Sequence, residues 1–157
     1  MQFSQAAILY TRADAGTALN AQGAPVQHVL NLHLAKTAWS RFRGLMLAPA
    51  LKTEPQTQGL LITRCPSVHG CFMRQAIDVV YLAAADESAA CTGPGLGSHT
   101  VTHTATLNPW GMSFGKSHVV VTPQGKRTLR SAHALELPAG SIQRLHISVG
   151  DTVEMTP

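Results

Sequence analysis

The sequence predicts a mostly β protein: a compact antiparallel β-sandwich or barrel-like single domain with one short α-helix at about residues 38–48. Short runs rich in Val, Ile, Leu and Thr follow one another along most of the chain, and Pro or Gly separates them. Only one segment has the helical spacing of apolar residues. The 157 residues match one ordinary domain and contain no repeat or linker, so we take residues 1–157 as a single domain.

A hairpin is predicted near the N-terminal end, from residues 6–11 and 26–36. In the second run Leu30, Leu32 and Leu34 fall on one face, and polar residues take the other. This period of two is that of a half-buried strand. A connection that contains Gly, Asn and Pro joins the two runs, which favours a turn between neighbouring strands.

The helix is predicted from the next segment, TAWSRFRGLMLAP. Thr37 can cap its start, and Trp39, Phe42 and Met46 recur at spacings of three and four. Pro49 cannot continue the helix, because it lacks a backbone N–H. The segment is therefore expected to form a short amphipathic helix.

Strands are predicted through the rest of the chain. Residues 84–98 combine small residues with glycines and a proline, so we predict a surface loop there. Closely spaced strands without intervening helices favour an antiparallel sandwich or barrel over a β-α-β layout. The expected strands are residues 59–63, 68–73, 77–83, 101–107, 118–122, 134–137 and 145–149.

Composition and charge exclude several classes of protein. The formal net charge is +4, but the 12 Lys and Arg residues are scattered and form no basic stripe, which argues against a nucleic-acid partner. No run approaches the roughly 20 apolar residues of a membrane span. The N-terminus lacks the basic region of a signal peptide. We expect a soluble cytoplasmic protein whose three cysteines are reduced.

The stretch CPSVHGCFMRQAIDVVYL, residues 65–82, contains the densest group of side chains that could bind a metal ion or take part in catalysis. On an extended strand His69, Cys71 and Met73 would share a face. Together with Cys65 they are soft ligands suited to Cu(I) or Zn(II). Alternate strand residues lie about 6.5–7 Å apart, and no CxxC or HExxH motif is present. A soft-metal site is therefore an alternative and not the main prediction.

Two further interpretations of the same stretch remain open. Free Cys and Met are common core residues, so Cys71 and Met73 can simply pack against apolar neighbours. In a thiol-dependent enzyme, Cys65 or Cys71 would be the nucleophile, with His69 as its base and Asp78 to orient the imidazole. The sequence alone does not say which of these groups meet in space.

Six separated motifs support a resemblance to a known family. They are RFRGLM, QGLLI, VHGCFMRQAIDVVYL, LNPWG, HALELPAG and VGD, in this order. Over about residues 26–155 the chain resembles the uncharacterised prokaryotic family called domain of unknown function 192. The resemblance implies a β-sandwich or barrel-like domain with one short helix, and it implies no established activity. Some relatives accompany secretion or pilus systems, and many carry an export signal.

The main hypothesis is a non-catalytic ligand-binding or accessory protein with a polar pocket near the helix and the central strand. Charged side chains stand within or beside apolar motifs, where burial without a partner costs several kcal/mol each. They must pair with one another or face a polar ligand. No cofactor is predicted, and the expected partner is a small ligand or a protein, with a secretion or pilus assembly component as one candidate. The candidate pocket residues are Arg41, Cys65, His69, Met73, Asp78 and Glu136.

Overall fold

The computed structural model describes most of the predicted strands. Most of the helix predicted at residues 38–48 and most of the loop predicted at 84–98 lie outside the described residues. In the part of the chain that is described, no helix is long and apolar enough to cross a membrane. The described residues are 5–11, 26–35, 45, 50–54, 56–84, 97–115, 118–121, 127–130 and 132–155.

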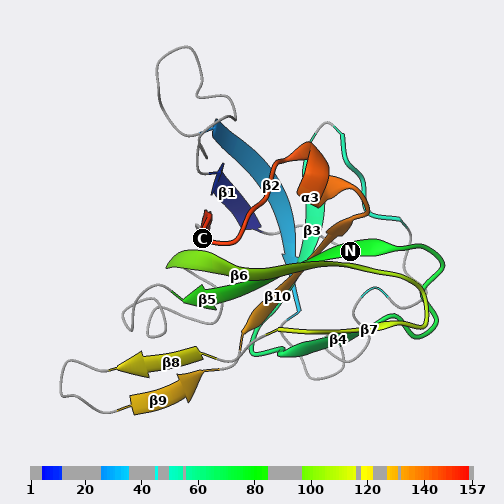
Figure 1. The fold of residues 1–157 in the computed structure, drawn as a ribbon. Coiled ribbons are helices and arrows are strands. Elements are labelled where there is room, and N and C mark those ends of the chain that lie inside the picture. The colour runs from blue at the N-terminus through cyan, green and yellow to red at the C-terminus, as the bar shows by residue number, and fades with distance from the viewer. Residues whose placement is uncertain are drawn as a thin grey trace.

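Seven of the described strands close into a barrel (Figure 1). The predicted mostly β class is confirmed. The predicted N-terminal hairpin is confirmed too, because the first two strands pair antiparallel along their lengths. The second and third strands run parallel, and the other neighbours in the barrel run antiparallel. In order around the barrel the strands are β1 (Gln5–Thr11), β11 (Thr152–Met155), β6 (Gly97–Leu107), β5 (Ile77–Ala84), β10 (His133–Pro138), β3 (Thr57–Ile62) and β2 (Val26–Leu34).

The barrel interior is an apolar core to which the wall strands contribute alternate side chains. In β10, for example, Leu135 and Leu137 point inward. The short helix α3 (Ser141–Arg144) is followed by Leu145 and Ile147, which join the same core. We call this set of residues the interior core.

A two-stranded ribbon, β4 (Ser67–His69) and β7 (Met112–Phe114), runs alongside one part of the barrel wall (Figure 1). The middle residue of β4, Val68, is buried between its neighbours and belongs to a second apolar cluster. This cluster also contains Val79 of β5 and Ala134 of β10. Both faces of that wall are therefore buried. We call the second cluster the ribbon core.

Two glycines allow the ribbon to lie close to its neighbours. A Cβ atom at Gly115 would overlap the ring of Tyr81 in β5. A Cβ atom at Gly70 would lie 2.5 Å from the carbonyl oxygen of Asn108. Gly70 N donates to Gly111 O over 2.8 Å, which ties the end of β4 to the turn before β7.

A third sheet of two strands, β8 (His118–Val121) and β9 (Arg127–Arg130), completes the described strands. The short β7, β9 and β11 and the helix α3 were not predicted from the sequence. Each has only three or four residues, too few to carry a periodic signal.

Two strand predictions are corrected by the structure. Residues 145–149 form no strand: they follow α3 as turns and irregular chain, from which Leu145 and Ile147 pack into the interior core. The strand predicted at 68–73 ends at His69. A turn follows, with Phe72 at φ 58, so the alternation that placed His69, Cys71 and Met73 on one face does not continue past Gly70.

Candidate functional site

Glu136 is a buried carboxyl group in the ribbon core. It alternates along β10 with Leu135 and Leu137 of the interior core, so it points to the opposite face of the wall. Its register partners are Leu60 on β3 and Val79 on β5, both of which belong to the ribbon core. The residue is 3% exposed. An ionisable side chain is therefore surrounded by apolar ones.

The Glu136 carboxyl group has an unsatisfied oxygen. Within the described structure, its Oε2 is buried and has no hydrogen-bond partner. Burial raises the pKa of Glu136 from 4.5 to about 8, because a carboxylate loses its hydration there and gains no compensating charge from the described residues. The group is therefore protonated at neutral pH, and it can act as a hydrogen-bond donor.

Tyr81 supplies a second unsatisfied hydroxyl group on the same face. It pairs in register with Ala134, two residues before Glu136, which makes the two side chains diagonal neighbours on adjacent strands. Tyr81 is fully buried, and among the described residues its hydroxyl meets no partner with hydrogen-bond geometry. Two proton-bearing groups thus lie in one apolar compartment.

Electrostatics confirm that Tyr81 and Glu136 belong to the same environment. Burial is the main cause that raises the pKa of Tyr81, and the negative charges of Cys65 and Glu136 would raise it further. Weak hydrogen-bond interactions with the Ser113 side chain and the Val68 backbone, which do not reach good hydrogen-bond geometry, act in the opposite direction. Cys65, Val68 and Ser113 therefore mark the surroundings of the Tyr81 hydroxyl.

Asp78 does not share this compartment. It precedes Val79 along β5 and points to the other face of the wall. Its Oδ1 accepts a hydrogen bond from Thr106 Oγ1 over 2.8 Å, and its Oδ2 accepts one from Ile142 N in the first turn of α3 over 2.8 Å. Ile142 packs against the interior core. The predicted pocket with both Asp78 and Glu136 is therefore corrected, because the sheet separates the two carboxyl groups.

The candidate soft-metal ligands in residues 65–82 also lie in different environments. Met73 is buried in the ribbon core, and Cys65 packs against that core. His69 and Cys71 are half-buried, and neither is part of the core. Among the described residues no group of three or more His, Cys, Asp or Glu side chains could hold a metal ion. The structure brings Cys65, Met73 and Glu136 to one compartment.

The geometry also bears on the thiol-dependent alternative. Cys65 Sγ donates to the backbone oxygen of Ser67 over 3.0 Å. The predicted orienting group, Asp78, is engaged by Thr106 and α3 on the other face of the wall, so it is not available to orient His69. That part of the interpretation is wrong.

Arg41 lies outside the described residues. The nearby Leu45 is described, and it is buried in the ribbon core with Val79 and Tyr81. On the predicted helix, residues four apart share a face. The expectation that Arg41 faces this compartment therefore stays a prediction.

Comparisons with known proteins identify the family. Residues 18–92 match the family model DUF192, described as Uncharacterized ACR. Over residues 18–92 the chain belongs to the DUF192 family. The family match contains Cys65, Met73 and Tyr81, and it ends before Glu136. It is shorter than the resemblance over about residues 26–155 that the sequence motifs indicate.

Solved structures resemble this DUF192 chain over nearly all of its length. A protein of unknown function from Novosphingobium aromaticivorans DSM 12444 has 18% sequence identity and a TM-score of 0.57, with 94% of this chain and 83% of that chain covered. A putative transcription regulator from Sinorhizobium meliloti 1021 has 17% identity and a TM-score of 0.58, with 99% and 96% covered. At this identity the likeness concerns the fold alone. No curated protein matches the chain.

Sequence reasoning missed Tyr81 as a site residue. The signal was present in Ile77, Val79 and Tyr81, which alternate along one strand and all reach the ribbon core. Tyr usually finds a partner for its hydroxyl when it is buried. A tyrosine in a run expected to be buried was therefore a reason to look for a polar neighbour.

Proposed function

We propose that this DUF192 domain is a non-catalytic binding protein for a largely apolar ligand that carries an acceptor oxygen. The protonated carboxyl of Glu136 and the hydroxyl of Tyr81 would donate to that oxygen. The observation that supports the proposal is the burial of both groups in the ribbon core, where Glu136 Oε2 has no hydrogen-bond partner among the described residues. A buried polar group without a partner costs about 1–3 kcal/mol, and a ligand oxygen would recover this free energy.

The chemistry of the pair favours an acceptor over a donor. A carboxylic acid that an apolar site keeps neutral can donate a hydrogen bond to an oxygen, and a tyrosine beside it can donate a second one. The apolar body of the ligand would contact side chains such as Val68 and Met73, which belong to the ribbon core. A cation would instead require ionised Glu136.

Two probes with the same eight-carbon skeleton separate these cases: 2-octanone, which only accepts hydrogen bonds, and octylamine, which is a cation at neutral pH. The protein contains two tyrosines, so carbon-13 labelling of tyrosine gives one signal from Tyr81 and one internal reference. We expect 2-octanone to shift the Tyr81 signal saturably and octylamine to leave it unchanged. A response to octylamine alone, or to neither probe, would overturn the proposal.

The matched variants are Tyr81→Phe and Glu136→Gln. Tyr81→Phe removes only an unsatisfied hydroxyl, so the fold is expected to stay intact while affinity for 2-octanone, measured by calorimetry, falls about tenfold. Equal affinity in wild type and Tyr81→Phe would refute the role of the hydroxyl. Glu136→Gln keeps the size of the side chain and offers an amide N–H donor in place of the carboxyl proton, so we expect an affinity close to that of wild type.

Pairing of Glu136 with Arg41 is the competing account of this compartment. It predicts an ionised Glu136 and a pKa below 4.5, whereas the proposal requires a pKa near 8. A carboxyl-carbon NMR titration of Glu136 distinguishes the two directly. Partnership with another protein, such as a secretion or pilus assembly component, stays a prediction, and so does a cytoplasmic location.

A further inference from the structure

The ribbon carries large apolar side chains on its surface. Phe72 is 53% exposed, Trp110 66%, Met112 63% and Phe114 61%. We call these four residues the aromatic patch. Scattered apolar residues are common on protein surfaces, but a contiguous group of large ones indicates an interaction site.

The four residues form one continuous surface. Met112 and Phe114 alternate with the buried Ser113 on β7, so they share the face directed away from the ribbon core. The rings of Phe72 and Trp110 pack edge to face with centroids 5.0 Å apart, in the turns that adjoin β4 and β7. The patch therefore extends from the ribbon surface to its end.

The backbone holds Phe72 and Trp110 in exposed positions at a cost. Both have positive φ, 58° and 66°, a conformation that is unfavourable for large side chains. Trp110 N donates to Gly70 O over 2.8 Å, which fixes the turn. Despite this strain, both rings stay more than half exposed in the free protein. It is consistent with a surface prepared for a partner.

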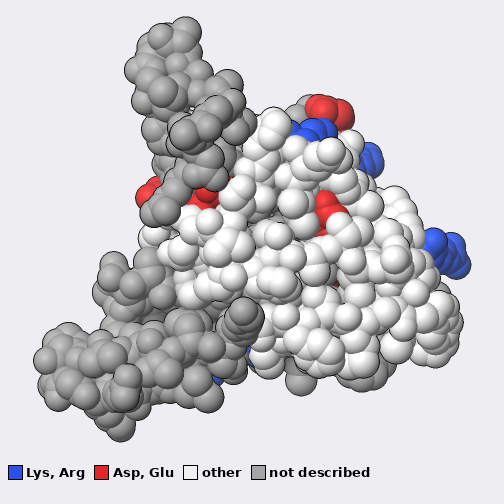
Figure 2. All heavy atoms as spheres, in the orientation of Figure 1, with Lys and Arg blue, Asp and Glu red and all other residues white. Residues whose placement is uncertain are grey.

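The charged side chains that the structure describes around the patch are basic. Arg74 is exposed two residues after Phe72, and Arg64 is exposed just before β4. Residues 55–77 and 88–135, which include the whole ribbon, contain no Asp or Glu. In Figure 2, the surface over the ribbon at the lower right is uncharged apart from basic atoms at its edge.

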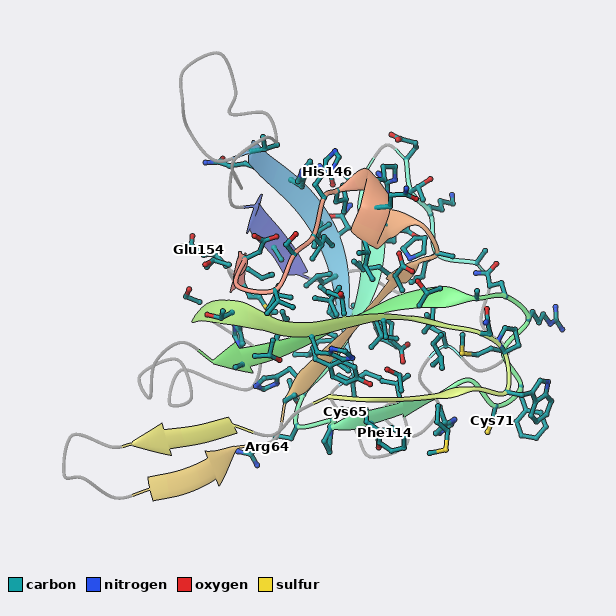
Figure 3. The ribbon with its side chains drawn as sticks, in the orientation of Figure 1. Arg64, Cys65, Cys71, Phe114, His146 and Glu154 are labelled. Carbon is teal, nitrogen blue, oxygen red and sulfur yellow. The ribbon has the colours of Figure 1, made fainter. Side chains whose placement is uncertain are left out.

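Among the described residues, the exposed acidic side chains lie elsewhere. Figure 3 shows Arg64, Phe114 and Cys71 along the ribbon, and the exposed Glu154 on the far side of the barrel. The patch thus combines aromatic side chains with basic flanks and lacks acidic residues. This combination complements an anionic surface that has an apolar layer beneath it.

The size of the patch bears on the kind of partner. Four large side chains that are just over half exposed offer on the order of 500 Å² of apolar surface, whereas a stable protein interface requires about 800 Å² from each partner. Aromatic side chains that enter the boundary between headgroups and acyl chains need no larger complementary surface. Nearby basic residues add about 1 kcal/mol each toward anionic lipids.

We propose that the aromatic patch binds this protein peripherally to the surface of an anionic lipid bilayer. Phe72 and Trp110 at the end of the ribbon enter the headgroup boundary, together with Met112 and Phe114. Arg64 and Arg74 lie toward the lipid phosphates. This inference rests on the outer face of the ribbon and does not depend on a ligand at Glu136.

Co-sedimentation with vesicles tests the proposal. The full chain is mixed with vesicles of phosphatidylcholine and phosphatidylglycerol, or of phosphatidylcholine alone. We expect binding to the anionic vesicles that weakens as salt is added. The sequence has two tryptophans, so Trp39→Phe leaves Trp110 as the reporter, and its fluorescence should shift to the blue on binding. No binding to anionic vesicles would overturn the proposal.

Surface variants identify the patch itself. Trp110→Ser with Phe114→Ser should weaken binding about tenfold or more, and Arg74→Gln about fivefold on anionic vesicles alone. Val149→Ser is the matched control, because Val149 is 62% exposed and lies outside the patch. Circular dichroism checks that each variant is folded.

Two outcomes would replace the bilayer with another partner. If Val149→Ser weakens binding as much as the double variant does, the patch is not the lipid contact. If sedimentation equilibrium shows a dimer that Phe114→Ser dissociates, and vesicles do not bind, the patch joins two copies of the chain.

Discussion

Asp78 and Glu136 are buried carboxyl groups on neighbouring strands of one barrel wall, and the fold treats them in opposite ways. Asp78 is 1% exposed and Glu136 is 3% exposed. Asp78 accepts hydrogen bonds from Thr106 and from the first turn of α3. Glu136 has an oxygen without a partner, and burial raises its pKa to about 8. Equal burial therefore does not imply an equal role.

The difference between Asp78 and Glu136 separates a carboxyl group that stabilises the fold from one that is available to a ligand. The hydrogen bonds of Asp78 join β5 to β6 and to α3, so its side chain stabilises the closed barrel. The proton of Glu136 offsets the loss of hydration but leaves its hydrogen-bonding capacity unused. The first group maintains the fold, and the second is the better candidate for contact with a ligand.

The largest expected effect is on the pH dependence of stability through Glu136. Its folded pKa of about 8 is above its ordinary value of 4.5. The folded state therefore loses stability as pH rises between these values, by about 1.4 kcal/mol per unit and about 5 kcal/mol in all. Urea unfolding of wild type and Glu136→Gln from pH 5 to 8 should give curves that diverge with pH.

The pKa of His99 changes stability with pH in the opposite direction, and the comparison of wild type with Glu136→Gln removes this contribution. Burial lowers the pKa of His99 below 6.5, so its contribution is present above that pH and is lost as pH falls. This term is common to both proteins and cancels in the difference. Parallel curves for wild type and Glu136→Gln would show that Glu136 is not buried as a neutral acid.

The next effect is the loss of stability in Asp78→Ala. It leaves Ile142 N and Thr106 Oγ1 without their acceptor, and we expect the free energy of unfolding to fall by about 3 kcal/mol. Thr106→Val removes only one of the two hydrogen bonds and should cost about 1 kcal/mol. Denaturant unfolding at neutral pH measures both. A loss in Asp78→Ala no larger than that in Thr106→Val would place the stabilisation elsewhere.

A smaller effect is expected where the ribbon meets the barrel. Gly115→Ala would place a methyl group in the ring of Tyr81, and the required shift should cost about 2 kcal/mol. The control is Gly111→Ala, whose Cβ would have its nearest neighbours at 3.1 Å, so its loss should be smaller. Thermal unfolding compares them. If both variants are equally stable, the ribbon is not fixed on Tyr81 as described.

The smallest effect is expected on the outer face of the ribbon. Phe114 is 61% exposed, so Phe114→Ser should change the free energy of unfolding by less than about 0.5 kcal/mol. Val68→Ala on the buried face should cost roughly 2 kcal/mol. Measured by urea unfolding, a large loss in Phe114→Ser would mean that the aromatic patch stabilises the fold and is not reserved for a partner.

Much of the fold could be predicted from local pattern. The alternation in residues 26–36 gave β2, and the apolar run at 77–83 gave β5, because side chains on a strand point alternately to its two faces. The pattern failed at residues 145–149. Leu145 and Ile147 pack into the interior core from the segment after α3, and two buried residues at this spacing look like one face of a strand.

The candidate site was predicted only in part. Apolar neighbours correctly marked Asp78 and Glu136 as buried carboxyl groups, and Tyr81 was overlooked. The sequence did not separate the two acids, because β5 and β10 are apolar on both faces and their pattern does not say which core each side chain enters.

The sequence by itself determined that strands would form, that their apolar faces would be buried, and that two acids would be buried with them. Only the tertiary structure decided that the wall has a core on each side, with Asp78 directed to one and Glu136 to the other. The physical reason is the separation along the chain of the residues that interact. Alternation is a property of neighbouring residues, whereas the Ile142 N–H that Asp78 binds comes from a residue 64 positions away along the chain.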